Sequence, residues 1–174
     1  NSITVTSSID TTITAVFEPA TSDSSAIVIN EINYNSADDY DTRDWVELAN
    51  NGSGAINLSG WQFKDEDDSH VFVIPEQTIL ENGAFIVLAE DTAIFNEFFP
   101  GTGPVVGNLN FGFSGGGELI RLYDANGVFI DQVTYDDDDP WPAEADGEGP
   151  TLELINPSLD NALASSWGYS TNMY

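Results

Sequence analysis

The segment Asp44-Trp45-Val46-Glu47-Leu48, followed by Leu58-Ser59-Gly60-Trp61, decides the fold. Successive residues of the first segment point to opposite faces, which is the two-residue periodicity of a β-strand. Residues 50–54 (Asn-Asn-Gly-Ser-Gly) then end the strand, because they tolerate positive φ. A second turn leads into another strand at Trp61. An indole buries about 150–250 Å², so we expect Trp45 and Trp61 to anchor a core between two β-sheets.

The rest of the chain extends this pattern with short apolar and β-branched runs. One short helix is expected over Thr92–Phe99, with Thr92 as its N-cap. In the Gly-rich segment that follows, Phe111 and Phe113 are expected to plug the core. The strands expected are Ala26–Tyr34, Asp44–Ala49, Gly60–Lys64, His70–Ile74, Ala84–Ala89, Glu118–Asp124 and Val128–Tyr135. About seven short strands with Gly and Asn turns predict an all-β sandwich.

The N-terminal segment carries two strand patterns, Ile3–Thr6 and Thr12–Phe17, around a polar turn. A hairpin alone is marginally stable in water, so we interpret this one as the end of a preceding domain. It resembles the closing strands of the internalin-type B-repeat of bacterial surface proteins. The expected organisation is therefore a hairpin over residues 1–19, a linker over 20–25, a sandwich over 26–167 and a tail over 168–174.

Several motifs between Ala26 and Trp167 resemble the bacterial lamin tail domain. They are Ile29-Asn30-Glu31-Ile32, Asp44–Leu48, Asn50-Asn51, Leu58–Trp61, Phe72–Pro75, Gly115–Leu122, Asp131–Tyr135, Pro140-Trp141-Pro142 and Asp146-Gly147. The resemblance implies an immunoglobulin-like β-sandwich without catalytic residues. It also implies an accessory module of secreted or cell-surface bacterial proteins, sometimes beside hydrolases or nucleases. The chain has neither the heptad rod nor the basic import signal of nuclear lamins, so chromatin binding is not expected.

Charge is the strongest feature of the composition. Three Lys and Arg residues face 30 Asp and Glu residues, for a net charge of −27. Such a surface repels nucleic acid and anionic membranes, and no apolar run approaches the ~20 residues of a membrane span. There is no cysteine for a disulfide or a thiolate metal site. We expect a monomeric, extracellular module whose ligand, a protein or a carbohydrate, is not a nucleic acid.

If successive strands reverse direction, three acidic loops gather at one end of the sandwich. Carboxylates crowded to ~5 Å repel by roughly 3 kcal/mol per pair at an effective dielectric of 20. A bound cation relieves this repulsion, and oxygen ligands select Ca²⁺. An acidic rim solvated in saline surroundings is the alternative, and the sequence leaves both open. The candidate metal ligands are Asp38, Asp39 and Asp41, then Asp65, Asp67 and Asp68, then Asp136 and Asp137.

Catalysis has little support in the sequence. His70 is the only histidine, and its neighbours in the chain would point to different faces of a strand. Acids are so abundant that a carboxylate pair by itself indicates nothing. Glu31 and Glu47 are a separate case, because pairing of their strands would bring them together and require a donor such as Arg43 or Trp61.

Three functional hypotheses follow. The first is a non-catalytic spacer, adhesion or substrate-targeting module of a larger secreted or surface protein. The second is a calcium-stabilised module that binds carbohydrate or protein. The third is an enzyme fragment, or an accessory part of a secreted hydrolase or nuclease, that uses the acidic end. Trp141, held between two prolines, serves either as a stacking platform for sugar or as a lid over one end of the sandwich.

Overall fold

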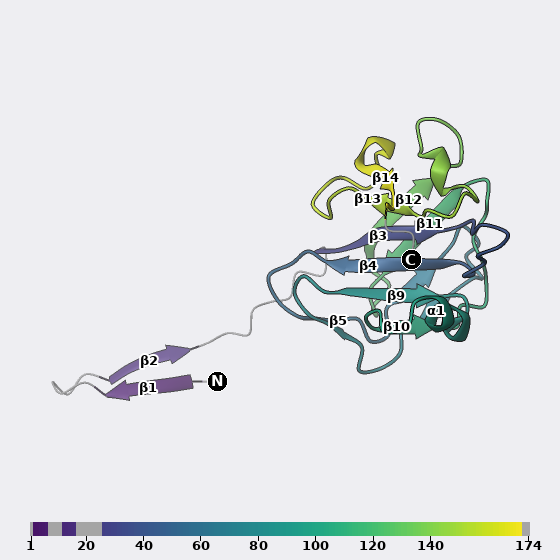
Figure 1. The fold of residues 1–174 in the computed structure, drawn as a ribbon. Coiled ribbons are helices and arrows are strands. Elements are labelled where there is room, and N and C mark those ends of the chain that lie inside the picture. Colours follow the sequence, from purple (N-terminus) through teal and green to yellow (C-terminus); the bar gives the residue numbers. More distant parts are fainter. Residues whose placement is uncertain (1, 7–11, 17–25, 172–174) are drawn as a thin grey trace.

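The computed structural model describes residues 2–6, 12–16 and 26–171, with the backbone alone in the first two ranges. Strands β1 (Ser2–Thr6) and β2 (Thr12–Val16) pair antiparallel (Figure 1), as expected of the N-terminal hairpin. The turn at residues 7–10 and the linker at 20–25 lie outside the described residues. Assignment of this hairpin to an internalin-type repeat stays a prediction.

A six-stranded sheet forms one layer of the remaining chain. Its order is β10 (Val105–Gly107), β9 (Phe85–Ala89), β4 (Trp45–Asn50), β3 (Ile27–Asn33), β13 (Leu152–Leu154) and β14 (Trp167–Tyr169). The β10–β9 pair is parallel, and every other pair in this sheet is antiparallel.

A four-stranded antiparallel sheet forms the second layer. Its order is β12 (Phe129–Tyr135), β11 (Glu118–Tyr123), β6 (Gln62–Lys64) and β7 (Phe72–Val73). A small ladder joins β5 (Ile56–Asn57) to β8 (Ile79–Leu80). The expected all-β, immunoglobulin-like sandwich is confirmed, and every expected strand is present. The short strands β5, β8, β10, β13 and β14 were not predicted from the sequence.

The main core lies between the two sheets. Val46 and Leu48 of β4 are fully buried in it, together with Phe63 of β6 and Leu122 of β11. Trp61 is 4% exposed and belongs to the same cluster, so its expected place between the sheets is confirmed. Phe111 and Phe113 also pack there, as expected.

Trp45 is not part of this core, so its predicted position between the sheets is wrong. It lies on the opposite face of the six-stranded sheet, in a second cluster with Val87, Phe95 and Phe99. Its indole meets the Phe95 ring edge-on at 5.4 Å and the Phe99 ring at 6.0 Å. Strand alternation placed Trp45 and Val46 on opposite faces correctly. Because both faces of this sheet are covered, burial alone did not tell which face meets the second sheet.

Helix α1 (Thr92–Phe98) covers part of that outer face. It lies beside β9 and β10 (Figure 1). Its N-cap is Asp91, and the expectation that Thr92 caps it is wrong. The Asp91 carboxylate accepts from the backbone N–H groups of Ala93 and Ile94, at 2.9 and 3.0 Å. Among the described residues, no helix has the length and apolarity that crossing a bilayer requires.

The chain after residue 136 returns to the six-stranded sheet. Leu152 of β13 pairs with Ile32 of β3, and β14 follows beside it. The boundary expected at Trp167 falls inside this sheet, because β14 runs to Tyr169. Trp141 is partly buried against the core and lies 6.1 Å from the Trp167 ring. Of the two expected roles, this packing favours the lid.

Candidate functional site

Three carboxylates form a row across the outer face of the six-stranded sheet. Glu153 of β13 is in register with Glu31 of β3, which is in register with Glu47 of β4. Side chains that face each other across a ladder lie about 4.5–5.5 Å apart at Cβ. We call these three residues the glutamate row.

A β-bulge in β3 turns Glu31 to this face. The register shifts between Ile29 and Glu31, so Asn30 is the extra residue. The bulge allows Ile29 and Ile32, three positions apart, both to enter the core while Glu31 faces outward. This spacing of two isoleucines around Asn30-Glu31 was visible in the sequence, although strict alternation does not predict it.

Neutral side chains supply the hydrogen bonds to the row. The Thr151 hydroxyl donates to Glu31, and the Asn30 amide donates to Glu47 at 2.9 Å. The prediction of Arg43 or Trp61 as donor is therefore wrong. Arg43 lies 3.4 Å from Asp41, in the loop between β3 and β4.

Burial dominates the electrostatics of the row. It raises the pKa of Glu31 to about 7, against the bond from Thr151, and the charges of Glu47 and Glu153 raise the pKa further. Burial also raises the pKa of Glu47, with Glu153 again adding to the effect. Among the described residues, no Lys, Arg or His lies beside the row to offset the free-energy cost of burying these carboxylates.

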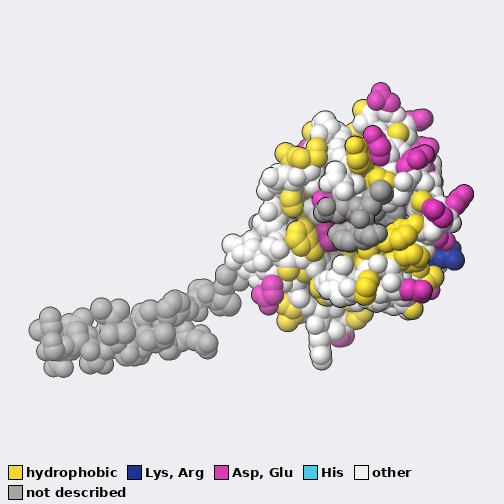
Figure 2. Space-filling view, viewed as in Figure 1, with side chains coloured by type: hydrophobic (Ala, Val, Ile, Leu, Met, Phe, Trp, Pro, Cys, Tyr) yellow, Lys and Arg dark blue, Asp and Glu magenta, His cyan; other side chains and the backbone are white. Residues whose placement is uncertain are grey.

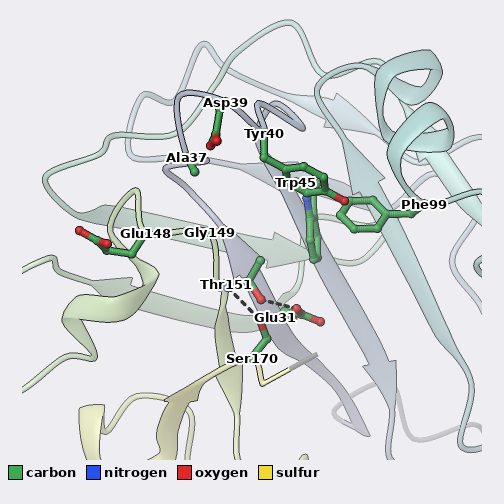
Figure 3. Close-up of a pocket in the computed structure, with 10 residues that line it drawn as sticks. All are labelled: Glu31, Ala37, Asp39, Tyr40, Trp45, Phe99, Glu148, Gly149, Thr151 and Ser170. Atoms are coloured by element: carbon green, nitrogen blue, oxygen red, sulfur yellow. Dashed lines mark hydrogen bonds between the residues drawn. The ribbon is translucent and has the colours of Figure 1, made fainter. Parts of the chain in front are cut away.

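Two adjoining pockets open on this face, with volumes of about 340 and 370 Å³. Glu31, Trp45 and Phe99 line both of them. In Figure 3, Tyr40, Trp45 and Phe99 stand on one side of the first pocket, and Glu31 lies below with Thr151 and Ser170. We call the joined pockets the outer groove. Figure 2 shows hydrophobic side chains gathered on this face of the molecule.

Two further carboxylates stand at the rim of the outer groove. Asp39, a predicted metal ligand, comes from the loop after β3, and Glu148 comes from the loop before β13. The groove therefore combines an aromatic wall with carboxylates from two strands and two loops. A wall of this kind favours ligands that carry positive charge on an apolar stem.

The three acidic loops do begin at one end of the sandwich. Glu118, at the start of β11, pairs with Tyr135 at the end of β12. The Tyr135 ring lies 4.7 Å from that of Tyr34, which follows β3. The end of β6 joins the same edge, because Lys64 pairs with Arg121. Strand reversal thus placed the loops correctly.

These loops do not merge into one cluster in the described part of the chain. Oxygens of Asp136, Asp137 and Asp138 lie within 4.8 Å of one another, close enough to share a cation. No candidate ligand from the other two loops belongs to that group. Asp38 is exposed, and Asp41 is paired with Arg43.

The loop after β6 uses its acids for its own structure. The buried Asp65 carboxylate lies 2.6 Å from His70 Nδ1 and also accepts from the Asp67 backbone at 2.8 Å. Asp67 accepts from Ser69, and Asp68 pairs with Arg121 at 2.9 Å. The Asp65–His70 pair was not predicted from the sequence, although an acid five residues before the only histidine was its signal.

The profile of the lamin tail domain family matches residues 20–137. The chain belongs to the lamin tail domain family. A search of curated proteins finds no match. The matched region stops before β13 and β14, yet β13 pairs with β3, so the sheet of this lamin tail domain extends beyond the match.

Lamin tail domains are an immunoglobulin-like, non-catalytic family. In this lamin tail domain burial raises the pKa of both Glu31 and Glu47, because it disfavours their charged forms. A positive group placed beside these carboxylates would favour the charged forms.

Proposed function

We propose that this lamin tail domain is a non-catalytic accessory module of a larger extracellular protein and that it binds its target through the outer groove. The observation that carries the proposal is the groove itself. Concave, mostly apolar sites with a few convergent polar groups are the usual form of a ligand site. Here Tyr40, Trp45 and Phe99 supply the apolar wall, and Glu31 and Asp39 supply the polar groups.

An extracellular setting suits the charge of the chain. A net charge of −27 keeps a protein soluble where salt screens its self-repulsion. The bacterial lamin tail domains that the sequence resembles occur in secreted and surface proteins. Fractionation of the source cells with an antibody against this domain tests the setting, and recovery in the cytoplasm alone contradicts it.

Nuclear magnetic resonance on the ¹⁵N-labelled chain tests the binding role. The probes are a neutral oligosaccharide, a short basic peptide and a short acidic peptide. We expect at least one of them to shift the amide signals of Glu31, Glu47 and Thr151, with those of the β11–β12 turn unmoved. The same chain should not turn over polysaccharide, phosphoester or peptide substrates. Turnover, or an unresponsive groove with all three probes, contradicts the proposal.

A calcium-stabilised form of the same module is the second candidate. One observation favours it, the convergence of Asp136, Asp137 and Asp138 within 4.8 Å. Thermal melts with Ca²⁺ and then with EDTA test this candidate. A reversible rise in Tm that the triple Asp→Asn variant loses supports it, and an unchanged Tm removes it.

A further inference from the structure

We propose that the outer groove receives a lysine or arginine side chain from a basic segment of a partner protein, seated between the glutamate row and the aromatic wall. This inference rests on the proposed function and names the ligand class of the same site. Two independent features carry it: carboxylates without a cation, and aromatic rings beside them in the same groove.

The chain has no cation of its own to spare for the groove. Its sequence contains three Lys and Arg residues. Arg43 pairs with Asp41 at 3.4 Å, Arg121 pairs with Asp68 at 2.9 Å, and Lys64 lies 5.6 Å above the Tyr123 ring. Since buried charges are normally paired, the half-buried Glu31 and Glu47 would gain from a positive partner that comes from outside the chain.

The aromatic wall selects the kind of cation. An ammonium or guanidinium group within about 6 Å of an aromatic ring is attracted to its face, most strongly by Trp. Trp45 is 5% exposed, and Phe99 is 8% exposed. Tyr40 stands beside them, 4.6 Å from the Phe98 ring. The parts of the Trp45 and Phe99 rings that remain exposed line both pockets beside Glu31, where the apolar stem of a Lys or Arg side chain would contact them.

One buried acceptor beside the row also lacks a donor. Asn30 is 6% exposed, and its Nδ2 donates to Glu47. Its Oδ1 has no hydrogen-bond partner among the described residues. A buried polar atom without a partner costs about 1–3 kcal/mol. Asn30 is not among the residues that line the two pockets, so this cost belongs to the sheet beneath the row and is not assigned to the ligand.

A hard metal ion fits the groove less well than a basic side chain. Ca²⁺ takes six to eight oxygen ligands. In the described part of the chain, Glu31, Glu47 and Glu153 do not converge as Asp136, Asp137 and Asp138 do. A guanidinium or ammonium on a long stem can instead contact successive carboxylates along the row while its methylenes cover the aromatic wall.

Protonation should compete with this ligand. The carboxylates that face the site are Glu31, Glu47 and Glu153 from the strands and Asp39 and Glu148 from the loops. A proton on Glu31 cancels the charge that attracts the ligand, and burial raises the pKa of Glu31 to about 7. Affinity should therefore fall as pH drops from 8 to 6.

The test uses a short peptide with one central lysine and the same peptide with that lysine Nε-acetylated. Acetylation removes the positive charge and leaves the stem. Titration of the ¹⁵N-labelled chain at pH 8 should place the lysine peptide in the groove. We expect acetylation to weaken binding by about tenfold or more. Equal affinity for the two peptides overturns the inference.

Matched variants separate the groove from the general charge of the chain. Glu31→Gln with Glu47→Gln removes two charges from the row, and Glu76→Gln with Glu81→Gln removes two from exposed loops. The first pair should weaken binding about tenfold and abolish its pH dependence, while the second should change it less than about twofold. Equal weakening by both pairs shows bulk attraction only and overturns the inference. A melt of each variant verifies folding.

The two proposals can fail separately. If the oligosaccharide or the acidic peptide shifts the groove and the lysine peptide does not, the accessory binding role stands and the cationic ligand is wrong. If no probe shifts the groove, both are wrong.

Discussion

Glu31 and Glu47 face each other across the β3–β4 ladder without a positive residue between them. Each instead accepts from a neutral side chain, Thr151 for Glu31 and Asn30 for Glu47. Like charges directly opposite on adjacent strands destabilise a sheet. The repulsion between Glu31 and Glu47 lowers the stability of the sheet locally. It lies in the groove, where binding of a positive group would offset the loss.

The first prediction concerns stability against pH. Burial raises the pKa of both Glu31 and Asp44 to about 7, from ordinary values of 4.5 and 3.8. The folded state therefore binds more protons than the unfolded state between about pH 4 and pH 7, so stability falls as pH rises through this window. We expect Tm to be higher at pH 5.5 than at pH 8.

Two isosteric variants check the origin of that slope. Glu31→Gln and Asp44→Asn should each raise Tm at pH 8 more than at pH 5.5 and so flatten the profile. The side-chain amide that the second change introduces can still accept from the Phe113 backbone N–H, whose nitrogen lies 2.5 Å from the Asp44 carboxylate. A profile that rises from pH 5.5 to pH 8 contradicts the assignment.

A second prediction concerns Thr151. Its hydroxyl donates to Glu31, and its backbone N–H donates to the Ser170 hydroxyl at 2.9 Å. Thr151→Val keeps the shape and removes the donor, leaving Glu31 without this bond. We expect a loss of about 1–3 kcal/mol in the free energy of unfolding at pH 8. The loss should shrink in the Glu31→Gln background, as a double-mutant cycle in urea would measure.

The N-terminus of α1 gives a third prediction. Asp91 accepts two backbone N–H bonds there, whereas the Thr92 hydroxyl bonds Asn108 at 3.0 Å on the exposed side. Asp91→Ala should cost about 1 kcal/mol of stability, and Thr92→Ala should cost less. Because α1 carries Phe95 onto Trp45, the first change should also alter Trp fluorescence. If Thr92→Ala lowered stability more than Asp91→Ala, Thr92 would be the N-cap and the assignment to Asp91 would be wrong.

The Asp65–His70 contact gives a fourth. The hydrogen bond from His70 to Asp65 raises the pKa of His70 above its ordinary 6.5. The stability this pair contributes is present below pH 6.5 and is lost as pH rises through the folded pKa. Proton resonance titration of His70 should show the raised pKa, and Asp65→Asn should lower it toward 6.5. An unchanged value in the variant contradicts the pairing.

Local patterns in the sequence predicted the strands well. Alternation at residues 44–48 separated the two faces of β4, and the other six strands predicted for the sandwich followed from similar runs. Alternation does not say which face meets the second sheet, so Trp45 was assigned to the wrong cluster. Its true neighbours, Phe95 and Phe99, lie on and just after a helix about 50 residues further along the chain.

Long-range pairing explains what the sequence could not predict at the site. Thr151 reaches Glu31 because β13 adds beside β3, across a separation of 120 residues. The bulge at Asn30 depends on how β3 fits β4, and no local propensity encodes it. The acidic loops could be recognised from the sequence because their aspartates are consecutive or nearly so. The groove could not, because its residues are scattered along the chain.

The Trp45 indole signal tests the central claim most directly. Its Nε1–H lies in the outer-face cluster and donates to Thr42 at 3.3 Å, while Trp61 is buried between the two sheets. On titration with the lysine peptide at pH 8, we expect the indole N–H resonance of Trp45 to shift and that of Trp61 to stay fixed. A shift of Trp61 alone, or of neither, would contradict binding in the outer groove.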